Sequence, residues 1–209
     1  TLNVQPVIPM SIGEDWNLIS RTIVPIVNQW DVVPGQGDQV GLGDTVQSLF
    51  FSPKALTAGG WTWGVGPVFL LPTATDDFLG TEKWGAGPTA VALRQTASGW
   101  SYGLLFNHIW SFAGSDDRQD VNATFLQPFV SKSLGQGRTV SFSLESTRDW
   151  ENDQWTVPLN LSYSKVSRIG KQLVSYQAGV RYYLDAPDNG AEWGLRFSFT
   201  LLYPRRPAP

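Results

Sequence analysis

The chain of 209 residues contains no cysteine, a single histidine and few charged residues, which make up 16% of it. Soluble domains average about 25% charged residues, so this chain has too few to cover an ordinary solvated surface. No apolar run approaches the roughly 20 residues that a membrane-spanning helix requires. The net charge of −3 offers no overall basic character, and we expect no nucleic-acid partner. These shortages exclude disulfide scaffolds, helical membrane proteins and nucleic-acid-binding proteins.

A starting methionine and a signal peptide are also missing, since the chain begins at Thr1. We therefore interpret it as a processed or truncated product. The absence of cysteine is compatible with secretion across an envelope. No linker of distinct composition interrupts the sequence, so we expect one domain over residues 1–209.

What the chain has in abundance is tryptophan and glycine, with 10 and 21 residues, arranged with a period of two. The stretch "GGWTWGVGPVFLLPTAT" (59–75) shows it best. One side carries Trp61, Trp63, Val65, Pro67, Phe69 and Leu71, and the other carries mainly threonine, glycine and smaller apolar residues. Side chains of a strand alternate between two faces, so this pattern predicts a strand with one wholly apolar face.

The same alternation recurs along the chain, for example in "RTVSFSLEST", "QWTVPLNLSYS" and "EWGLRFSFTLLY". No segment has a convincing helical period. We predict eleven strands, at 1–12, 15–31, 44–54, 60–72, 83–96, 99–113, 120–134, 138–149, 153–168, 172–185 and 191–204.

The connections between these strands alternate in length. Short turns lie at 13–15, 56–60, 97–99, 134–137 and 170–172, and longer, Gly- and Asp-rich loops lie at 32–43, 73–82, 113–119 and 186–190, with a brief exception at 151–153. Short turns at one end and long loops at the other are typical of outer-membrane barrels.

Strand length and tryptophan placement favour the same fold. The predicted strands have ten residues or more, whereas strands of globular sheets usually have about 5–6. Tilted strands of this length cross a bilayer. Aromatic residues near strand ends would form the two girdles at the membrane interfaces: Trp16, Trp30, Trp61, Trp100, Trp110, Trp155, Trp193 and Tyr203.

The alternative is a soluble β-sandwich whose apolar faces pack against each other. That fold leaves unexplained why the other faces carry Ser, Thr, Asn and Gly rather than Lys and Glu. We therefore expect an all-β protein, an antiparallel transmembrane β-barrel in the outer membrane of a Gram-negative bacterium, in contact with outer-membrane lipids.

Several long segments of the sequence resemble those of a known family: "NVQPVIPMSIGEDWNLISRTIVPIV", "GLGDTVQSLFFSP", "WGVGPVFLLPTATDDFLGTEKWGAGPTAV" and "ATFLQPF". They resemble the outer-membrane transporter family named after the MetA pathway of phenol degradation, over nearly the whole chain. The resemblance implies a barrel that moves small, often hydrophobic, molecules, and it brings no catalytic residues. Family members have a further strand-like segment before the position of Thr1.

The polar faces would line the lumen, with Asn160, Gln177 and Ser198 among the uncharged residues and Glu145, Arg181 and Arg196 as the charged ones. Counting from the turns places Glu145 opposite Pro158, Pro158 opposite Arg181, and Arg181 opposite Leu195 or Arg196. The three charges would then form a constriction that favours anionic or hydrogen-bonding solutes. The alternative is a charge network that only braces the wall.

Enzymatic and cofactor readings find little support. His108 falls on the apolar face, but its same-face neighbours Phe106 and Trp110 are not nucleophiles and Ser111 faces the other way, so we expect no catalytic role. The acidic pairs Asp76–Asp77 and Asp116–Asp117 could bind calcium, although solvated loop charge is the preferred reading. "GQGDQVGLGD" (35–44) lacks the lysine and helix of a phosphate site. We expect no cofactor and no metal.

Three features complicate the barrel. Prolines 6, 9, 25, 67, 88, 128 and 158 fall inside predicted strands, twice within "WGxGP", and predict bulges or unpaired ladder positions. The facing of 83–96 is ambiguous because of Arg94. Eleven strands are also an odd number, whereas bacterial barrels normally have an even one. We therefore expect a twelfth strand, encoded before Thr1 or supplied by another chain, such as a homo-oligomer partner.

The sequence thus predicts a passive outer-membrane channel or uptake pore for a small-molecule solute. The alternatives are an outer-membrane lipid or ester hydrolase and a barrel with only a structural or assembly role.

Overall fold

The computed structural model describes residues 1–30, 37–188 and 190–203, and it consists there of strands, turns and loops. Predicted features at residues 31–36, 189 and 204–209 lie outside this part. No helix in the described residues is long and apolar enough to cross a membrane. The sequence-based prediction of an all-β, antiparallel fold is confirmed.

Fifteen strands make up the sheet, several of them fragments of one predicted strand. They are β1 (Leu2–Val4), β2 (Val7–Ile12), β3 (Trp16–Gln29), β4 (Gln39–Leu42), β5 (Thr45–Pro53), β6 (Trp61–Leu71), β7 (Lys83–Gln95), β8 (Trp100–Gly114), β9 (Asn122–Gly135), β10 (Arg138–Leu144), β11 (Ser146–Asp149), β12 (Gln154–Thr156), β13 (Pro158–Ile169), β14 (Gln172–Tyr183) and β15 (Trp193–Leu202).

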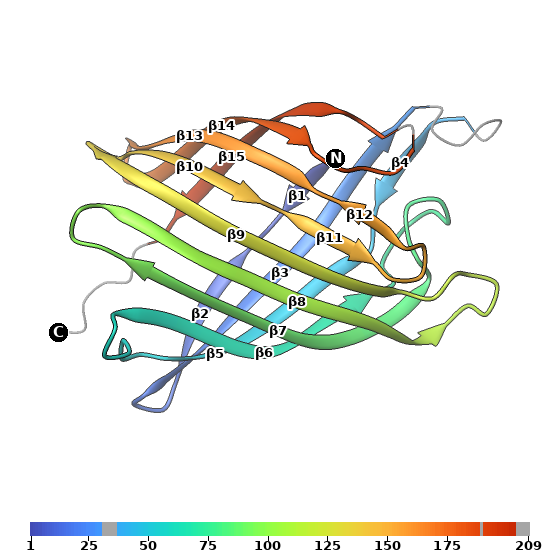
Figure 1. Ribbon diagram of the computed structural model, residues 1–209, viewed down its shortest axis with the longest axis horizontal. Coiled ribbons are helices and arrows are strands. Elements are labelled where there is room, and N and C mark those ends of the chain that lie inside the picture. The colour runs from blue at the N-terminus through green and yellow to red at the C-terminus, as the bar shows by residue number, and fades with distance from the viewer. Residues whose placement is uncertain (31–36, 189, 204–209) are drawn as a thin grey trace. The chain divides into compact units, whose positions relative to one another are not determined.

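Hydrogen-bonded neighbours follow the order β1-β3-β5-β6-β7-β8-β9-β10-β13-β14-β15 (Figure 1). This path contains as many strands as we predicted. Its strands follow one another in chain order, as strands joined by successive hairpins do. The order begins at β1 and ends at β15, and the ladders between described residues do not close the sheet. Closure into a barrel therefore belongs to the proposal made below.

The chain divides into two compact units. Unit 1 comprises residues 1–92, 105–125 and 148–154, and unit 2 comprises residues 93–104, 126–147 and 155–209. Strands β7, β8 and β9 contribute residues to both units. The expectation of one domain stays a prediction, and the two units are described separately below.

Two segments of unit 1 differ from the predicted strands. The strand predicted at 1–12 is two strands, because Pro6 has no N–H to donate and interrupts the pairing with β3. Strand β4 lies in a segment predicted as loop, and it pairs with the end of β3. Its "GLG" looked like loop composition, but a Cβ at Gly41 would come within 2.2 Å of the Thr75 hydroxyl oxygen. The glycine serves close packing rather than a turn.

Unit 2 contains two strand interruptions that face each other. Residue Glu145 separates β10 from β11, and Val157 separates β12 from β13. The Glu145 amide still donates to the Pro158 carbonyl at 3.0 Å, but Pro158 has no N–H to return the bond. The Val157 amide donates a hydrogen bond to the Asp185 carbonyl at 2.8 Å. Proline chemistry therefore splits strands that the sequence pattern showed as continuous.

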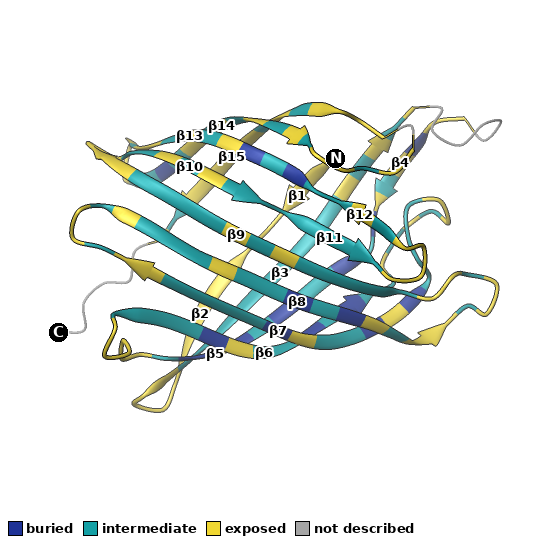
Figure 2. Ribbon diagram, viewed as in Figure 1, coloured by how far each residue is buried: buried dark blue, intermediate teal, exposed yellow. Residues whose placement is uncertain are grey.

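Figure 2 shows exposed residues in yellow and intermediate or buried residues in teal and dark blue along the strands. In β15 the odd-numbered residues are exposed, as is Thr200, and Phe197 reaches 74%. In β7 the buried residues are Lys83, Gly85 and Thr89, whereas Trp84 and Pro88 are exposed, so Arg94 belongs to the exposed face at the strand's end. The apolar core described is small and lies in unit 1, where Val68, Leu70 and Ile109 pack together.

The "WGxGP" segments show how proline is accommodated in a strand. Pairing of β5 with β6 stops between Ser48↔Val68 and Phe51↔Val65 and resumes in the same register, so the ladder is unpaired there without a bulge. A Cβ at Gly66 would lie 2.0 Å from the Leu49 carbonyl oxygen, and one at Gly87 would lie 1.8 Å from the His108 carbonyl oxygen. The glycine before each proline thus lets the neighbouring backbone approach closely.

Candidate functional site

Four adjacent strand segments of unit 2 bring the predicted charged residues together. Asn160 of β13 pairs with Arg181 of β14, and Gly179 of β14 pairs with Arg196 of β15. Glu145 lies at the end of β10, bonded through its amide to Pro158.

The predicted register was correct for Glu145 and Pro158 and wrong by about two residues for the next two pairs. Pro158 pairs with Tyr183 rather than Arg181, and Arg181 pairs with Gly194 rather than Leu195 or Arg196. The turn after β13 contains only Gly170 and Lys171, because Ile169 and Gln172 already pair. Side chains as long as arginine span such an offset, so the cluster still forms.

Glu145 accepts hydrogen bonds from both arginines. Arg181 Nη2 donates to its Oε2, and Arg196 Nη1 donates to its Oε1 at 2.5 Å. Gln127 Nε2 adds a longer bond to Oε1, at 3.4 Å. The exposed fraction of the side chain rises from 16% for Glu145 through 26% for Arg181 to 40% for Arg196. The carboxylate is thus enclosed by donors, and the trio carries one net positive charge.

Uncharged polar side chains extend the site along the same face of the sheet. Arg181 Nε donates to Asn160 Oδ1 at 2.8 Å, and Gln177 Nε2 donates to Ser162 Oγ at 2.6 Å. Asn160 is buried, with 6% of its surface exposed. Ser198, the third predicted polar residue, pairs with Gln177 across β14 and β15. Each of these groups offers both donors and acceptors.

A cavity of about 260 Å³ adjoins these residues within unit 2. Glu145, Arg196, Asn160 and Gln177 are among its lining residues, together with serines of β9, β10 and β13. Arg196 is the most exposed member of the charged trio and uses Nη1 for Glu145. Chemically, the site can hold a small molecule that accepts hydrogen bonds, with a preference for negative charge.

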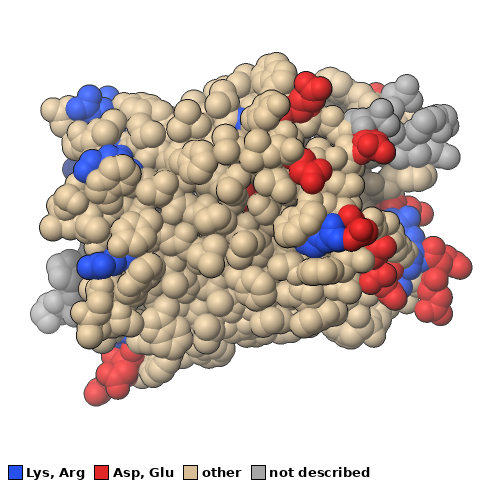
Figure 3. Space-filling model, viewed as in Figure 1, with Lys and Arg blue, Asp and Glu red and all other residues tan. Residues whose placement is uncertain are grey.

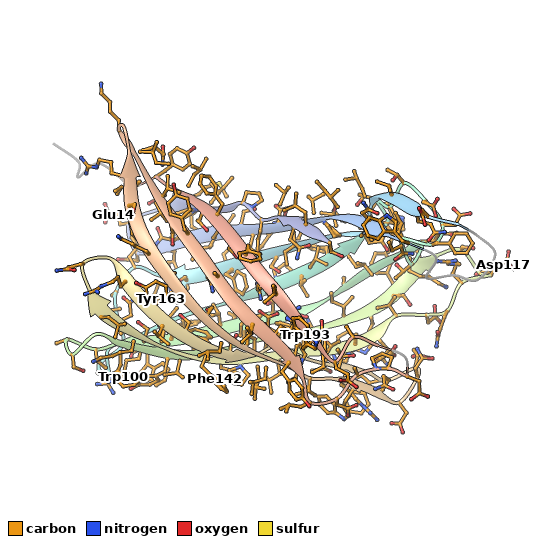
Figure 4. The ribbon with its side chains drawn as sticks, turned by 90° about the horizontal axis from the view of Figure 1, so that it is seen from above. Glu14, Trp100, Asp117, Phe142, Tyr163 and Trp193 are labelled. Atoms are coloured by element: carbon orange, nitrogen blue, oxygen red, sulfur yellow. The ribbon has the colours of Figure 1, made fainter. Side chains whose placement is uncertain are left out.

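The opposite face of unit 2 is apolar and exposed. Phe142 of β10, Tyr163 of β13 and Trp193 of β15 belong to it, and Figure 4 labels all three. Of the eight aromatic residues predicted for membrane interfaces, seven are exposed and Trp61 is half-buried. Trp16, Trp61, Trp100 and Trp193 are the first residues of their strands.

His108 has a partner in unit 1 that sequence reasoning missed. Its Nδ1 lies 2.7 Å from Thr124 Oγ1, and the Trp150 indole Nε1 donates to the same oxygen at 2.8 Å. The expected absence of a nearby hydroxyl considered only residues of the same strand. Pairing of Ser111 with Val121 across β8 and β9 is the signal that would have found Thr124. Within the part of the chain that the structure describes, His108 Nε2 is buried without a hydrogen-bond partner.

The long loops of unit 1 hold a second charged network that the sequence did not single out. Buried Lys83 donates to Asp120 Oδ1 at 2.9 Å, and Ser111 donates to the same oxygen at 3.0 Å. The Lys83 ammonium, followed by the Ser111 hydroxyl, holds the pKa of the Asp120 carboxyl below its usual value. Arg118 donates to the carbonyl oxygens of Asp77 and Gly80.

Of the acidic pairs considered for calcium, Asp76 has a local partner. Asp76 accepts from the amide of Phe78 at 2.9 Å, as a turn-forming aspartate does. Over residues 1–30, 37–188 and 190–203, no group of three or more histidine or acidic side chains is placed to hold a metal ion.

Comparison with known proteins gave no match to a family model, to a curated protein or to a solved structure. The family resemblance described above therefore stays a prediction.

Proposed function

We propose that the chain is an outer-membrane channel of a Gram-negative bacterium, through which small solutes with an anionic or hydrogen-bonding group diffuse passively. The observation that carries the proposal is the two-sidedness of unit 2. One face of four neighbouring strands is apolar and exposed, and the other holds the Glu145–Arg181–Arg196 cluster beside a polar cavity.

Exposure of the apolar face supports a membrane setting. In β15 the side chains of Trp193, Leu195, Phe197 and Phe199 are all at least 60% exposed. Contiguous apolar patches of that kind are rare on soluble monomers, because each exposed square ångström costs about 25 cal/mol relative to burial. Lipid tails would remove that cost without any protein partner.

The polar face supports passage rather than bracing alone. A bracing network would be expected to neutralise itself, whereas this trio keeps one net positive charge beside a cavity. A ring of cationic side chains in a confined pore favours anions. Arg196, which is the more exposed arginine, would contact the solute, and Arg181 would be held by Glu145 and Asn160.

A membrane barrel would also need its two outer strands covered. Open sheet edges are not tolerated in hydrocarbon, where each unmet group costs several kcal/mol. The twelfth strand predicted from parity would supply that pairing. Mass spectrometry of the protein isolated from its natural source tests for such a strand, in the same chain or in a bound partner chain.

Single-channel conductance in planar bilayers tests the channel. The wild-type chain should conduct, with a reversal potential that shows anion preference in a salt gradient. Arg181→Ala with Arg196→Ala should raise conductance and abolish that preference. The matched control, Lys54→Ala with Lys171→Ala, removes two turn cations and should change neither. A reconstituted protein without ion current would favour a structural or assembly role.

One observation favours the alternative of a lipid or ester hydrolase, namely the contact between His108 and the Thr124 hydroxyl on the exposed side of unit 1. Covalent catalysis needs a nucleophile, a base and a group that orients the base. Thr124 and His108 could fill the first two roles. Hydrolysis of a phospholipid ester by the wild-type chain, lost in both Thr124→Val and His108→Ala, would establish it.

A further inference from the structure

Charges in unit 2 are segregated along the strands. Six cations gather where its short turns lie: Arg94, Lys132, Arg138, Lys165, Arg168 and Lys171. No acidic residue occurs in segments 93–104, 126–144, 159–184 and 193–203 of the described chain. The acids of unit 2 are Glu145, which the arginines enclose, and Asp185, Asp188 and Glu192 in the long loop. Figure 3 shows blue patches at the end where the β9–β10 and β13–β14 turns lie in Figure 1.

Strand register places three of these cations, Lys132, Arg138 and Lys165, side by side on neighbouring strands. Arg138 pairs with Lys165, Lys132 pairs with Val140, and Val140 pairs with Tyr163. Paired residues share a face of the sheet, and Arg138 and Val140 are two apart on one strand, so all five lie on the same face. This face is the exposed apolar one, because Val140 and Tyr163 are both exposed. We call Lys132, Arg138, Lys165 and the turn residue Lys171 the cationic band.

Within the cationic band Lys132 donates to the Ser98 carbonyl at 2.6 Å, but the Arg138–Lys165 pair carries a cost that no described carboxylate relieves. Arg138 and Lys165 are directly opposite each other, and like charges in that position destabilise a sheet. The acid-free segments around them provide no carboxylate. Arg138 has only a long bond to the Gly135 carbonyl, at 3.4 Å. A bound anion between the two side chains would remove the repulsion.

On the same face of the sheet, the residues directly next to the cationic band are apolar. Tyr163 and Leu161 follow Lys165 along β13, and the Lys132 ammonium lies 5.0 Å from the centre of the exposed Trp100 ring. From Lys165 to Leu161 is four residues, or roughly 13 Å of strand. The surface therefore matches a molecule with an anionic end and an apolar end. An acidic soluble partner would match the cationic band but not the apolar surface beside it.

We propose that the cationic band binds the phosphate-bearing headgroups of anionic phospholipids, with their acyl chains against the apolar face of unit 2. This inference rests on the proposed membrane setting but not on conduction. Arg138 and Lys165 would share one phosphate, and Lys132 and Lys171 would contact neighbouring headgroups. A cation near an anionic headgroup layer contributes about 1 kcal/mol, which corresponds to roughly a 5-fold change in affinity.

Titration of the full chain in non-ionic detergent with short-chain lipids tests the proposal. Dioctanoyl phosphatidylglycerol should bind at least ten-fold more tightly than dioctanoyl phosphatidylcholine, and added salt should weaken that preference. Lys165→Gln should lower phosphatidylglycerol affinity about 5-fold and Arg138→Gln with Lys165→Gln about 25-fold. Phosphatidylcholine binding should stay unchanged. Lys54→Gln, a turn cation of unit 1, is the matched control and should behave as wild type.

A stability readout separates lost binding from lost folding. Arg138→Gln should raise the thermal midpoint in the absence of lipid, because it removes the repulsion, and it should reduce the stabilisation that phosphatidylglycerol gives. Equal affinity for the two lipids, an equal loss in Lys54→Gln, or equally tight binding of polyglutamate would overturn the proposal. Flotation with vesicles of either lipid tests the membrane setting separately: a chain that floats without lipid preference refutes only this inference.

Discussion

Alanine at Gly66 or Gly87 should destabilise the fold more than an ordinary glycine substitution. The added Cβ would lie 2.0 Å from the Leu49 carbonyl oxygen at Gly66 and 1.8 Å from the His108 carbonyl oxygen at Gly87. Ordinary contact begins at 3.4 Å, so the backbones must separate by 3.4 − 2.0 = 1.4 Å and 3.4 − 1.8 = 1.6 Å. Both neighbours are backbone atoms, which cannot rotate away as a side chain can.

The cost follows from that separation. The cross-strand bonds that flank each glycine, which are typically about 2.9 Å long, would stretch well past the usual limit of a hydrogen bond. Two such bonds, at about 1 kcal/mol each, and about 1–3 kcal/mol of overpacking give a loss of roughly 3–5 kcal/mol. Gly194→Ala is the matched control, because a Cβ there meets nothing within 4 Å. Its effect should stay within about 1 kcal/mol of wild type.

Urea unfolding in detergent, followed by tryptophan fluorescence, measures these differences. Gly66→Ala and Gly87→Ala should lower the midpoint clearly, while Gly194→Ala leaves it nearly unchanged. If all three variants unfolded together with wild type, the close approach of the strands at "WGxGP" would not be a requirement of the fold.

Three further predictions concern charged and catalytic candidates. Glu145→Gln leaves Arg181 and Arg196 facing each other, and we expect a thermal destabilisation of about 1–2 kcal/mol, less than for a fully buried pair because both arginines are partly exposed, with stronger anion preference in bilayers. The Asp120 carboxyl has its pKa lowered by Lys83, so its stabilisation is present above the unfolded pKa of about 3.9 and is lost as pH falls further. Unfolding of wild type should thus depend on pH below about 4 more steeply than that of Asp120→Asn, and identical profiles would refute the role of this pair. His108→Ala should leave phospholipid ester hydrolysis at the wild-type level, whereas a reproducible loss would support the hydrolase alternative.

Side-chain periodicity was enough to predict most strands, because exposure alternates over most of segments such as β15, from Trp193 to Phe199. It failed where backbone chemistry decides. Pro6 and Pro158 split predicted strands, and Gly41 of β4 resembled part of a loop while serving close packing. Neither effect changes which residues are apolar, so the period of two does not show it, whereas the prolines themselves had predicted unpaired ladder positions.

The Glu145–Arg181–Arg196 cluster was predictable because long side chains tolerate a register error of two residues. Thr124 was not found, because its contact with His108 depends on the exact pairing of β8 with β9. The net charge of −3 gave no indication of the cationic band, because it sums over the whole chain. The cations of unit 2 have no acidic neighbour along their strands.

In the membrane setting proposed above, the hydrogen bond between Trp150 and Thr124 has a consequence for the depth of the indole. An indole is drawn to the headgroup layer because its N–H needs an acceptor. The Trp150 N–H already has one in the Thr124 hydroxyl, at 2.8 Å. Its ring is therefore released from the water boundary and could sit among acyl chains without an unmet donor. Brominated lipids with the bromine deep in the chain should quench Trp150 more than an indole that depends on headgroups for its acceptor.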